Sequence, residues 1–296
     1  IDGTKTVNRN WKITNNNLTF TECDVTFNWS PSDADLVGNP NNYILGKLNS
    51  SVWTLPVVSA RTATSLSVLD LNSFSEFQIG EPLATTPAAA LNFDGINDQV
   101  VINNAGIDLT NKSFTVEMWL KRNSANTYDV AFSQGTAGAD NQLLHMGFSN
   151  DNEFIFNFFG GPNDLEIPIT NDANWHHWAC TFDNTAKTRK VYRDGVLIGQ
   201  ATIPTSTFTG NGSFSTIGVT SAYPGDEFDG SIDELRIWTR TLSASEVLNN
   251  FNCEISSQPG LAAAYHFNQG FEGANNAAEN TLTDATGNNN TGNLQN

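Results

Sequence analysis

One short stretch of the sequence gathers oxygen donors at close spacing. Asp94, Asn97 and Asp98 supply three side-chain oxygens, and Gly95 allows the backbone to turn a carbonyl inward. Calcium takes about six to eight oxygen ligands from carboxylates, amides and carbonyls, so this loop is a candidate calcium site. It is not an EF-hand, because the spacing and the terminal glutamate of that motif are missing. The alternative is that these side chains only accept backbone N–H bonds within turns.

A further carboxylate of interest is Asp233, in the stretch FDGSIDELRIW at residues 228–238. Alternation along this predicted strand places Asp233 on the same side as Leu235 and Ile237, and Glu234 on the opposite side. A carboxylate that faces a core must be hydrogen-bonded, paired or bound to a cation. Asp233 is therefore expected either to accept backbone N–H bonds or to bind a cation.

Sugar-binding sites combine an aromatic face with amide and carboxylate partners. Two regions offer this combination, NSANTYDV with Tyr128 and Asp129, and FFGGPND with Phe159, Asn163 and Asp164. These five residues form the candidate ligand-binding set, with Tyr128 and Phe159 as the platform for a sugar ring. The alternative is that the phenylalanines lie in the core and the asparagines in ordinary turns.

The same residue types give little support for catalysis. Retaining glycosidases need two carboxyl groups about 5 Å apart, and none of the strands predicted in the second domain carries acidic residues at i and i+2. His176 and His177 are adjacent on a predicted strand, so they point to opposite faces and cannot bind one metal as a local pair. We expect no catalytic residues and no enzyme, with glycoside hydrolysis as the less favoured alternative.

The bulk composition narrows the class of partner. The 296 residues include 14 Lys and Arg and 31 Asp and Glu, for a net charge of −17. This charge disfavours nucleic acid and anionic membrane surfaces, and it suits a hard cation such as calcium. No apolar run is long enough to span a membrane. Cys23, Cys180 and Cys253 form no CxxC motif and allow at most one disulfide within the chain.

The candidate site residues must be positioned by short runs of alternating polar and apolar residues, which turn-rich segments separate. These runs predict an all-β protein with two β-sandwich domains. Residues 1–85 predict a small β-sandwich, followed by a short proline-containing linker. Residues 86–270 predict the second sandwich, and residues 271–296 predict an Asn-, Gly- and Thr-rich tail that buries little.

Two local signals in the second domain are specific. Asp194 and Gly195 lie between two alternating runs and predict a tight hairpin. Ser243 and Glu246 form a capping box, which predicts one short helix over residues 242–248.

Residues 88–252 resemble the laminin-G-like, concanavalin A-like lectin/glucanase family. The resemblance is carried by five motifs in the family's order: ALNFDGINDQVVI, SFTVEMWLKR, NWHHWACTFD, VYRDGVLIG and FDGSIDELRIWTRTLSASEV. It implies a jelly roll of two packed antiparallel sheets, a carbohydrate or protein ligand and, in many members, calcium. Carried over to this sequence, the calcium ligands would include Asp233 together with Asp94 or Gly95.

The segment LAAAYHF at residues 261–267 departs from the family's order, because similar text usually lies upstream of the FDG motif. It either closes the same sandwich or begins a further module. The first is favoured, since an exposed apolar strand would invite aggregation.

These expectations converge on a non-catalytic carbohydrate-binding module. The resemblance implies an adhesion module of a large secreted or cell-surface bacterial protein. Its partners would be a glycan or cell-surface polysaccharide and the neighbouring modules of the same longer chain. The alternative is a protein-binding or structural spacer module. The chain begins at Ile1, which suggests a piece of a longer, processed protein.

Overall fold

The structure is a computed structural model of the 296-residue chain. It describes residues 5–36, 40, 43–49, 52–81, 89–103, 105–136, 138–160, 164–170, 173–212, 214–220, 225–255, 257–270, 276 and 279–296. Contacts divide the chain into two compact units, residues 1–85 with 243–253 and residues 86–242 with 254–296. Most of the predicted linker lies outside the described residues. Among those described, no helix combines the length and hydropathy needed to cross a membrane.

The first unit contains two antiparallel sheets, as the short alternating runs predict. One sheet has the order β1-β7-β3-β4, with bounds Thr6–Lys12, Glu76–Gly80, Ile44–Asn49 and Val52–Thr54. The other has the order β2-β6-β5, with bounds Cys23–Asn28, Ser65–Leu71 and Val58–Thr62. A 3-10 turn, η1, spans Pro31–Asp33. Phe27, Tyr43 and Phe77 are buried in the core of this unit.

The second unit contains two larger antiparallel sheets, and the all-β prediction is confirmed. The seven-stranded sheet has the order β17-β16-β15-β10-β19-β20, and β8 pairs with β19 off this path. Its strands span Val196–Thr202, Thr188–Arg193, His176–Asp183, Phe114–Arg122, Asp229–Trp238, Leu261–Tyr265 and, for β8, Leu91–Asp94.

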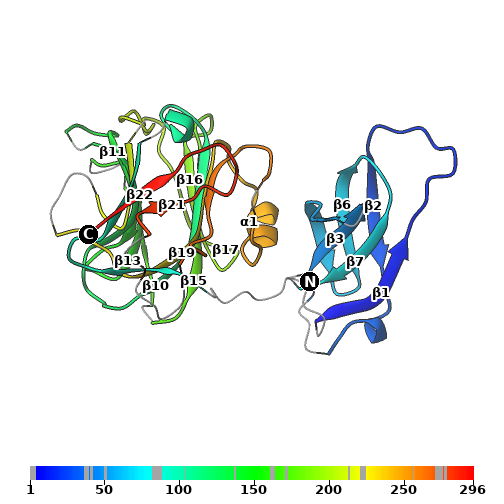
Figure 1. Ribbon diagram of the computed structural model, residues 1–296. Coiled ribbons are helices and arrows are strands. Elements are labelled where there is room, and N and C mark those ends of the chain that lie inside the picture. Colours follow the sequence, from blue (N-terminus) through cyan, green and yellow to red (C-terminus); the bar gives the residue numbers. More distant parts are fainter. Residues whose placement is uncertain are drawn as a thin grey trace. The chain divides into compact units, whose positions relative to one another are not determined.

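The eight-stranded sheet has the order β14-β13-β12-β11-β18-β9-β22-β21. Its strands span Leu165–Pro168, Glu153–Asn157, Leu143–Phe148, Asp129–Gly135, Phe214–Ile217, Gln99–Asn103, Gly292–Gln295 and Thr281–Leu282. A 3-10 turn, η3, spans Ala105–Ile107. In Figure 1, β15, β16 and β19 lie on one side of this unit and β11 and β22 on the other.

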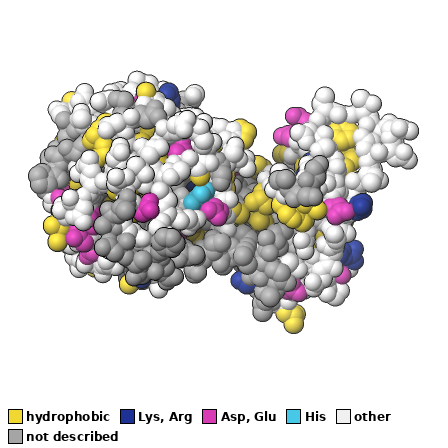
Figure 2. Space-filling view, viewed as in Figure 1, with side chains coloured by type: hydrophobic (Ala, Val, Ile, Leu, Met, Phe, Trp, Pro, Cys, Tyr) yellow, Lys and Arg dark blue, Asp and Glu magenta, His cyan; other side chains and the backbone are white. Residues whose placement is uncertain are grey.

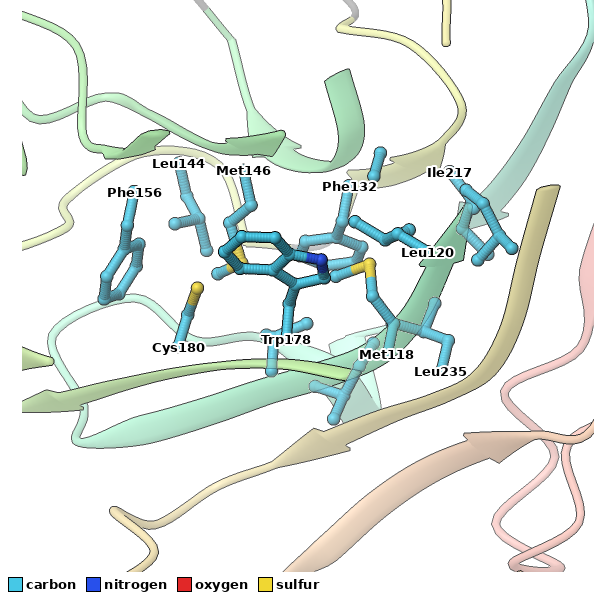
Figure 3. Packing of buried hydrophobic residues seen from close by; sticks show 14 of the residues in the cluster. Met118, Leu120, Phe132, Leu144, Met146, Phe156, Trp178, Cys180, Ile217 and Leu235 are labelled. Carbon is cyan, nitrogen blue, oxygen red and sulfur yellow. The ribbon is translucent and has the colours of Figure 1, made fainter. Parts of the chain in front are cut away.

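The two sheets bury their alternating apolar side chains against each other. The ring of Trp178 on β15 stacks on that of Phe154 on β13, with centroids 4.0 Å apart and planes 3° from parallel. Figure 3 shows the indole of Trp178 between side chains of both sheets, among them Met118 and Met146. Such a stack adds to the free energy of burying the rings and fixes how the sheets face each other. Cys180 is buried in this core, and all three cysteines are free thiols.

Both local turn signals are confirmed. Asp194 and Gly195 join β16 to β17 with φ of 52° and 78°, the left-handed backbone that a type I′ hairpin requires. The helix α1 spans Ala244–Asn250. Ser243 accepts a hydrogen bond from the Glu246 amide, and the Glu246 carboxylate accepts one from the Ser243 amide, which is the predicted capping box.

The C-terminal strand closes the same sandwich. β20 pairs with β19, with Tyr265 opposite Leu235, so residues 261–267 do not begin a separate module. The expectation of a tail that buries little is wrong. β22 pairs with β9, and Leu282 is buried.

The Asn-rich tail folds mainly through hydrogen bonds, which hydropathy does not register. Buried Asp284 accepts hydrogen bonds from the backbone amides of Ala264, Thr286 and Asn290. Asn290 in turn donates to the carbonyl of Ala262 and accepts the hydroxyl proton of Tyr265. A carboxylate with several backbone donors is among the stronger hydrogen-bonding groups in proteins.

Candidate functional site

A pocket of about 600 Å³ lies on the outer face of the eight-stranded sheet. Strand alternation creates this face: Leu144 and Met146 enter the core, whereas His145 between them points outward. His145 and Asn157 are direct cross-strand partners on β12 and β13. The pocket is lined by Tyr128, Leu143, His145, Asn157, Phe159, Gly160, Asp164, Glu166, Thr220 and Asp226. Its volume is in the range of small-molecule sites; we call it the outer-sheet pocket.

A hydrogen bond to His145 orients the hydroxyl of Tyr128. Its hydroxyl lies 3.2 Å from Nε2 of His145, and Nδ1 of the same ring lies 3.3 Å from the carbonyl of Leu143. Burial lowers the pKa of His145 to about 4, so the ring is neutral at pH 7. A neutral ring that donates from Nδ1 to Leu143 must accept at Nε2, so the Tyr128 hydroxyl donates to it.

Three carboxylates line the pocket with Tyr128 and act on its phenol. Burial raises the pKa of the Tyr128 phenol, and the negative charges of Asp226, Asp164 and Glu166 raise it further. Burial raises the pKa of Asp164 to about 6, against the opposing effect of Arg189. Oδ1 of Asp164 is buried without a hydrogen-bond partner among the described residues. A buried acceptor without a partner is unusual, which marks this part of the pocket as a candidate functional site.

Phe159 reaches the pocket because it follows a core residue in an extended segment. Phe158 is buried in the core, so alternation places Phe159 on the other face, and its φ of 63° lies in the left-handed region. Gly160 follows with a φ of 109°, and a Cβ at this position would lie 2.5 Å from a carboxylate oxygen of Asp140. A φ of 109° is strained for a residue with a Cβ, so this position favours glycine.

Of the predicted ligand-binding residues, the structure brings Tyr128, Phe159 and Asp164 together in the outer-sheet pocket. Asp129 does not line it, because its carboxylate is buried 2.5 Å from Nε of Arg122 and also accepts from Thr127. A buried carboxylate needs such a partner. Asn163 lies outside the described residues.

The sequence reasoning missed His145, Asn157, Glu166, Thr220 and Asp226. Asp164 lies directly before β14 and Glu166 lies on it, and alternation did not predict this strand. The expectation that acidic residues at i and i+2 do not share a site is therefore wrong for this pair. The i, i+2 spacing of these two acidic residues was visible in the sequence and could have identified the pair.

The prediction that Asp233 faces the core is wrong. The register of β19 against β10 shifts between Asp233 and Arg236, and Glu234 has a φ of 50°, so the strand contains a β-bulge. The bulge leaves Ile232, Leu235 and Ile237 in the core and places Asp233 beside Trp119 on the outer face. Asp233 accepts the amide proton of Glu234 at 2.8 Å, and burial raises its pKa to about 8.

The five predicted calcium ligands do not form one site. Asp94 lies opposite Asp229 in the β8–β19 pairing, and Asp233 is four residues further along β19, about 13 Å away at strand spacing. Asp94 accepts the Ile96 amide, and Asp98 accepts the Asp94 amide, as turn-capping side chains do.

The remaining loop residues show how the turn is built. Asn97 is exposed. A Cβ on Gly95 would lie 3.0 Å from the Cβ of Asp229, so the turn packs closely on this residue of β19. The carboxylate of Asp229 accepts hydrogen bonds from Asn123 and Ser124.

A different group of acidic and histidine side chains meets on the outer face of the seven-stranded sheet. Ligand atoms of Glu234, Glu254 and His266 lie within 4.8 Å of one another, the one such group among the described residues. Nδ1 of His266 lies 2.8 Å from the Glu234 carboxylate. Burial by itself lowers the pKa of His266, but the hydrogen bond and charge of Glu234 outweigh it and raise the pKa.

Acidic side chains are scattered over the face of the second unit visible in Figure 2, in a surface that is otherwise mainly uncharged. This distribution agrees with the net charge of −17. The outer-sheet pocket, with its three carboxylates, shares this character.

Known proteins resemble about half of the chain in sequence. Neuronal pentraxin-1 of Rattus norvegicus is 27% identical over 163 residues, which cover 52% of this chain and 37% of that protein. Sushi, von Willebrand factor type A, EGF and pentraxin domain-containing protein 1 of the same species is 27% identical over 161 residues, 52% of this chain and 4% of that protein. The chain thus spans only a minor part of these relatives.

A solved structure resembles the whole chain. A candidate carbohydrate-binding protein of Bacteroides ovatus ATCC 8483 matches with a TM-score of 0.56 and 15% identity, over 100% of this chain and 92% of that one. At this identity the likeness concerns the fold. The family model described as the concanavalin A-like lectin/glucanases superfamily matches residues 94–248, just over half of the chain. With its two packed antiparallel sheets and this match, the chain belongs to the concanavalin A-like lectin/glucanase superfamily.

Proposed function

We propose that the second unit binds a glycan in the outer-sheet pocket and does so without catalysis. The observation that carries the proposal is the arrangement around Tyr128, whose hydroxyl is oriented by His145 and which lines the pocket together with Asp164, Glu166 and Asp226. An aromatic ring flanked by fixed hydrogen-bonding groups is what recognition of a sugar ring requires.

The comparisons support a lectin-like role. The superfamily includes lectins by its name, and the Bacteroides ovatus protein is described as carbohydrate-binding. We further propose that the chain is an adhesion module of a secreted or cell-surface multidomain bacterial protein. In that setting its partner would be a cell-surface polysaccharide.

The test is binding of the purified chain to an array of plant, microbial and animal glycans. We expect binding that Tyr128→Ala reduces at least tenfold, because the variant removes both the ring and the hydroxyl. Trp53→Ala is the matched control, since Trp53 is an exposed aromatic residue of the first unit. Absence of binding by the unmodified chain would favour the spacer or protein-binding alternative.

One observation favours a second candidate function, glycoside hydrolysis. Asp164, whose pKa is raised to about 6, and Glu166 share the pocket, and a carboxylic acid with a raised pKa beside a carboxylate is the pairing that glycosidases use. Release of reducing sugar from a bound polysaccharide, lost in Glu166→Gln, would establish this activity. Binding without release supports the non-catalytic proposal.

A further inference from the structure

We propose that the outer-sheet pocket selects sugars that donate hydrogen bonds and carry no negative charge, and that it binds a sugar with a free amino group most tightly. This inference rests on the proposed glycan-binding function. Asp164, Glu166 and Asp226 line the pocket, and none of its described lining residues is lysine or arginine. Residues 161–163 and 221–224, which adjoin lining residues in the sequence, include no lysine or arginine.

The orientation of the polar groups leads to the same conclusion. The hydroxyl proton of Tyr128 is used on His145, so its oxygen faces a ligand as an acceptor. The amide of Asn157 donates to Glu166 at 3.4 Å and accepts from the Leu165 amide at 2.8 Å. The pocket is therefore dominated by acceptors, which hydroxyl and ammonium groups can satisfy but carboxylate and sulfate groups cannot.

The hydroxyl of Thr220 is placed in the same way. It donates to the Asp226 carboxylate at 3.3 Å, so this donor is also directed to a neighbouring residue of the pocket. A ligand that approaches Thr220 and Asp226 therefore meets a carboxylate that is already in place. Its own hydroxyl or ammonium protons are what can complete the hydrogen bonding there.

The nearby cations do not reverse this electrostatic character. Arg189 interacts electrostatically with Asp164, but its guanidinium is buried, donates to the Phe156 carbonyl at 2.8 Å and lies 4.5 Å from the centroid of the Phe158 ring. Arg122 is paired with Asp129. His145 is neutral at pH 7, because burial lowers its pKa to about 4. An anionic sugar would therefore bring its charge beside carboxylates, and no described lining residue of the pocket is a cation that could compensate it.

The inference predicts a ranking of three trisaccharides that differ in charge. A β-1,4-linked glucosamine trimer should bind more tightly than its N-acetylated counterpart, and both more tightly than trigalacturonate, by calorimetry at neutral pH. We expect at least about a tenfold difference between the cationic and anionic sugars, because charge-assisted hydrogen bonds favour the first and repulsion disfavours the second. The cationic preference should fall as salt is added.

Variants separate a built site from general attraction to an acidic protein. Glu166→Gln with Asp226→Asn should reduce the ratio of cationic to anionic affinity about tenfold, whereas Glu22→Gln with Asp24→Asn, exposed residues of the first unit, should not. Trigalacturonate binding as tightly as the glucosamine trimer overturns the inference and leaves glycan binding intact. Binding of the glucosamine trimer that Tyr128→Ala leaves as tight as in the unmodified chain overturns the assignment to this pocket. If none of the three sugars and no glycan on the array binds, the proposed function itself fails.

Discussion

Asp164 holds a carboxylate where burial disfavours its charge. Its pKa is raised to about 6 in the folded protein, above the ordinary value of 3.8 that the unfolded chain would show. Between these two values the unfolded state has released its proton and the folded state still holds it. This group therefore contributes to a loss of stability as the pH rises from about 4 to 6, and the loss persists above pH 6.

We predict that Asp164→Asn raises the melting temperature at pH 7.5 and has little effect near pH 4. The amide keeps the shape of the protonated carboxyl and never acquires a charge, so the penalty at high pH is removed. Melting curves of both proteins across this pH range provide the measurement. Glu279→Gln, at an exposed position, is the control for loss of one negative charge. A variant less stable than the parent protein at pH 7.5 would contradict the prediction.

At the scale of single elements, the sequence predicts regular strands and turns and misses irregular ones. Alternation places Val116 and Met118 in the core, and the turn at Asp194 and the cap at Ser243 follow from local chemistry. The bulge at Glu234 was not predictable, because one extra residue reverses the faces of a strand without a mark in the pattern. That reversal removed Asp233 from the predicted core.

The candidate site was predicted only in part, because some of its residues lie in loops and others on strands. Tyr128, Phe159 and Asp164 were predicted from residue type in loops, and the structure brings them together. His145 and Glu166 lie on strands, and only strand order and register bring them to those loops. Register depends on long-range pairing, which residue spacing along one strand does not reveal.

Substitution of Asp284 tests whether its hydrogen bonds stabilise the polar C-terminal segment. We predict that Asp284→Ala destabilises the second unit by about 3 kcal/mol, because it leaves buried amides without an acceptor. Exchange of amide hydrogens should increase mainly in residues 279–296, where Asp284 accepts the Asn290 amide between β21 and β22. Asp284→Asn, which retains one acceptor oxygen, should lose less stability. Unchanged exchange in this segment would show that strand pairing alone holds the tail.

At the scale of the whole molecule, the excess of 31 acidic over 14 basic residues means that any salt relieves repulsion and can raise the melting temperature. Calcium binding therefore has to be separated from screening. The predicted ligand set is divided by the strand register, and the part that stays together is the turn of Asp94 and Asp98 against Asp229. We propose this turn as the place where calcium would act.

We predict that millimolar calcium raises the melting temperature of the second unit beyond the effect of sodium chloride at equal ionic strength, and that chelator reverses it. A ligand that binds only the folded state stabilises it by about 2.7 kcal/mol at one hundred times its Kd. Asp98→Asn should reduce this response, because it removes a charged oxygen from the turn. Asp233→Asn should leave the response unchanged, since Asp233 lies about 13 Å along β19 from the turn. A response lost in Asp233→Asn and kept in Asp98→Asn would instead assign the ion to the outer face of the seven-stranded sheet, where Glu234, Glu254 and His266 meet.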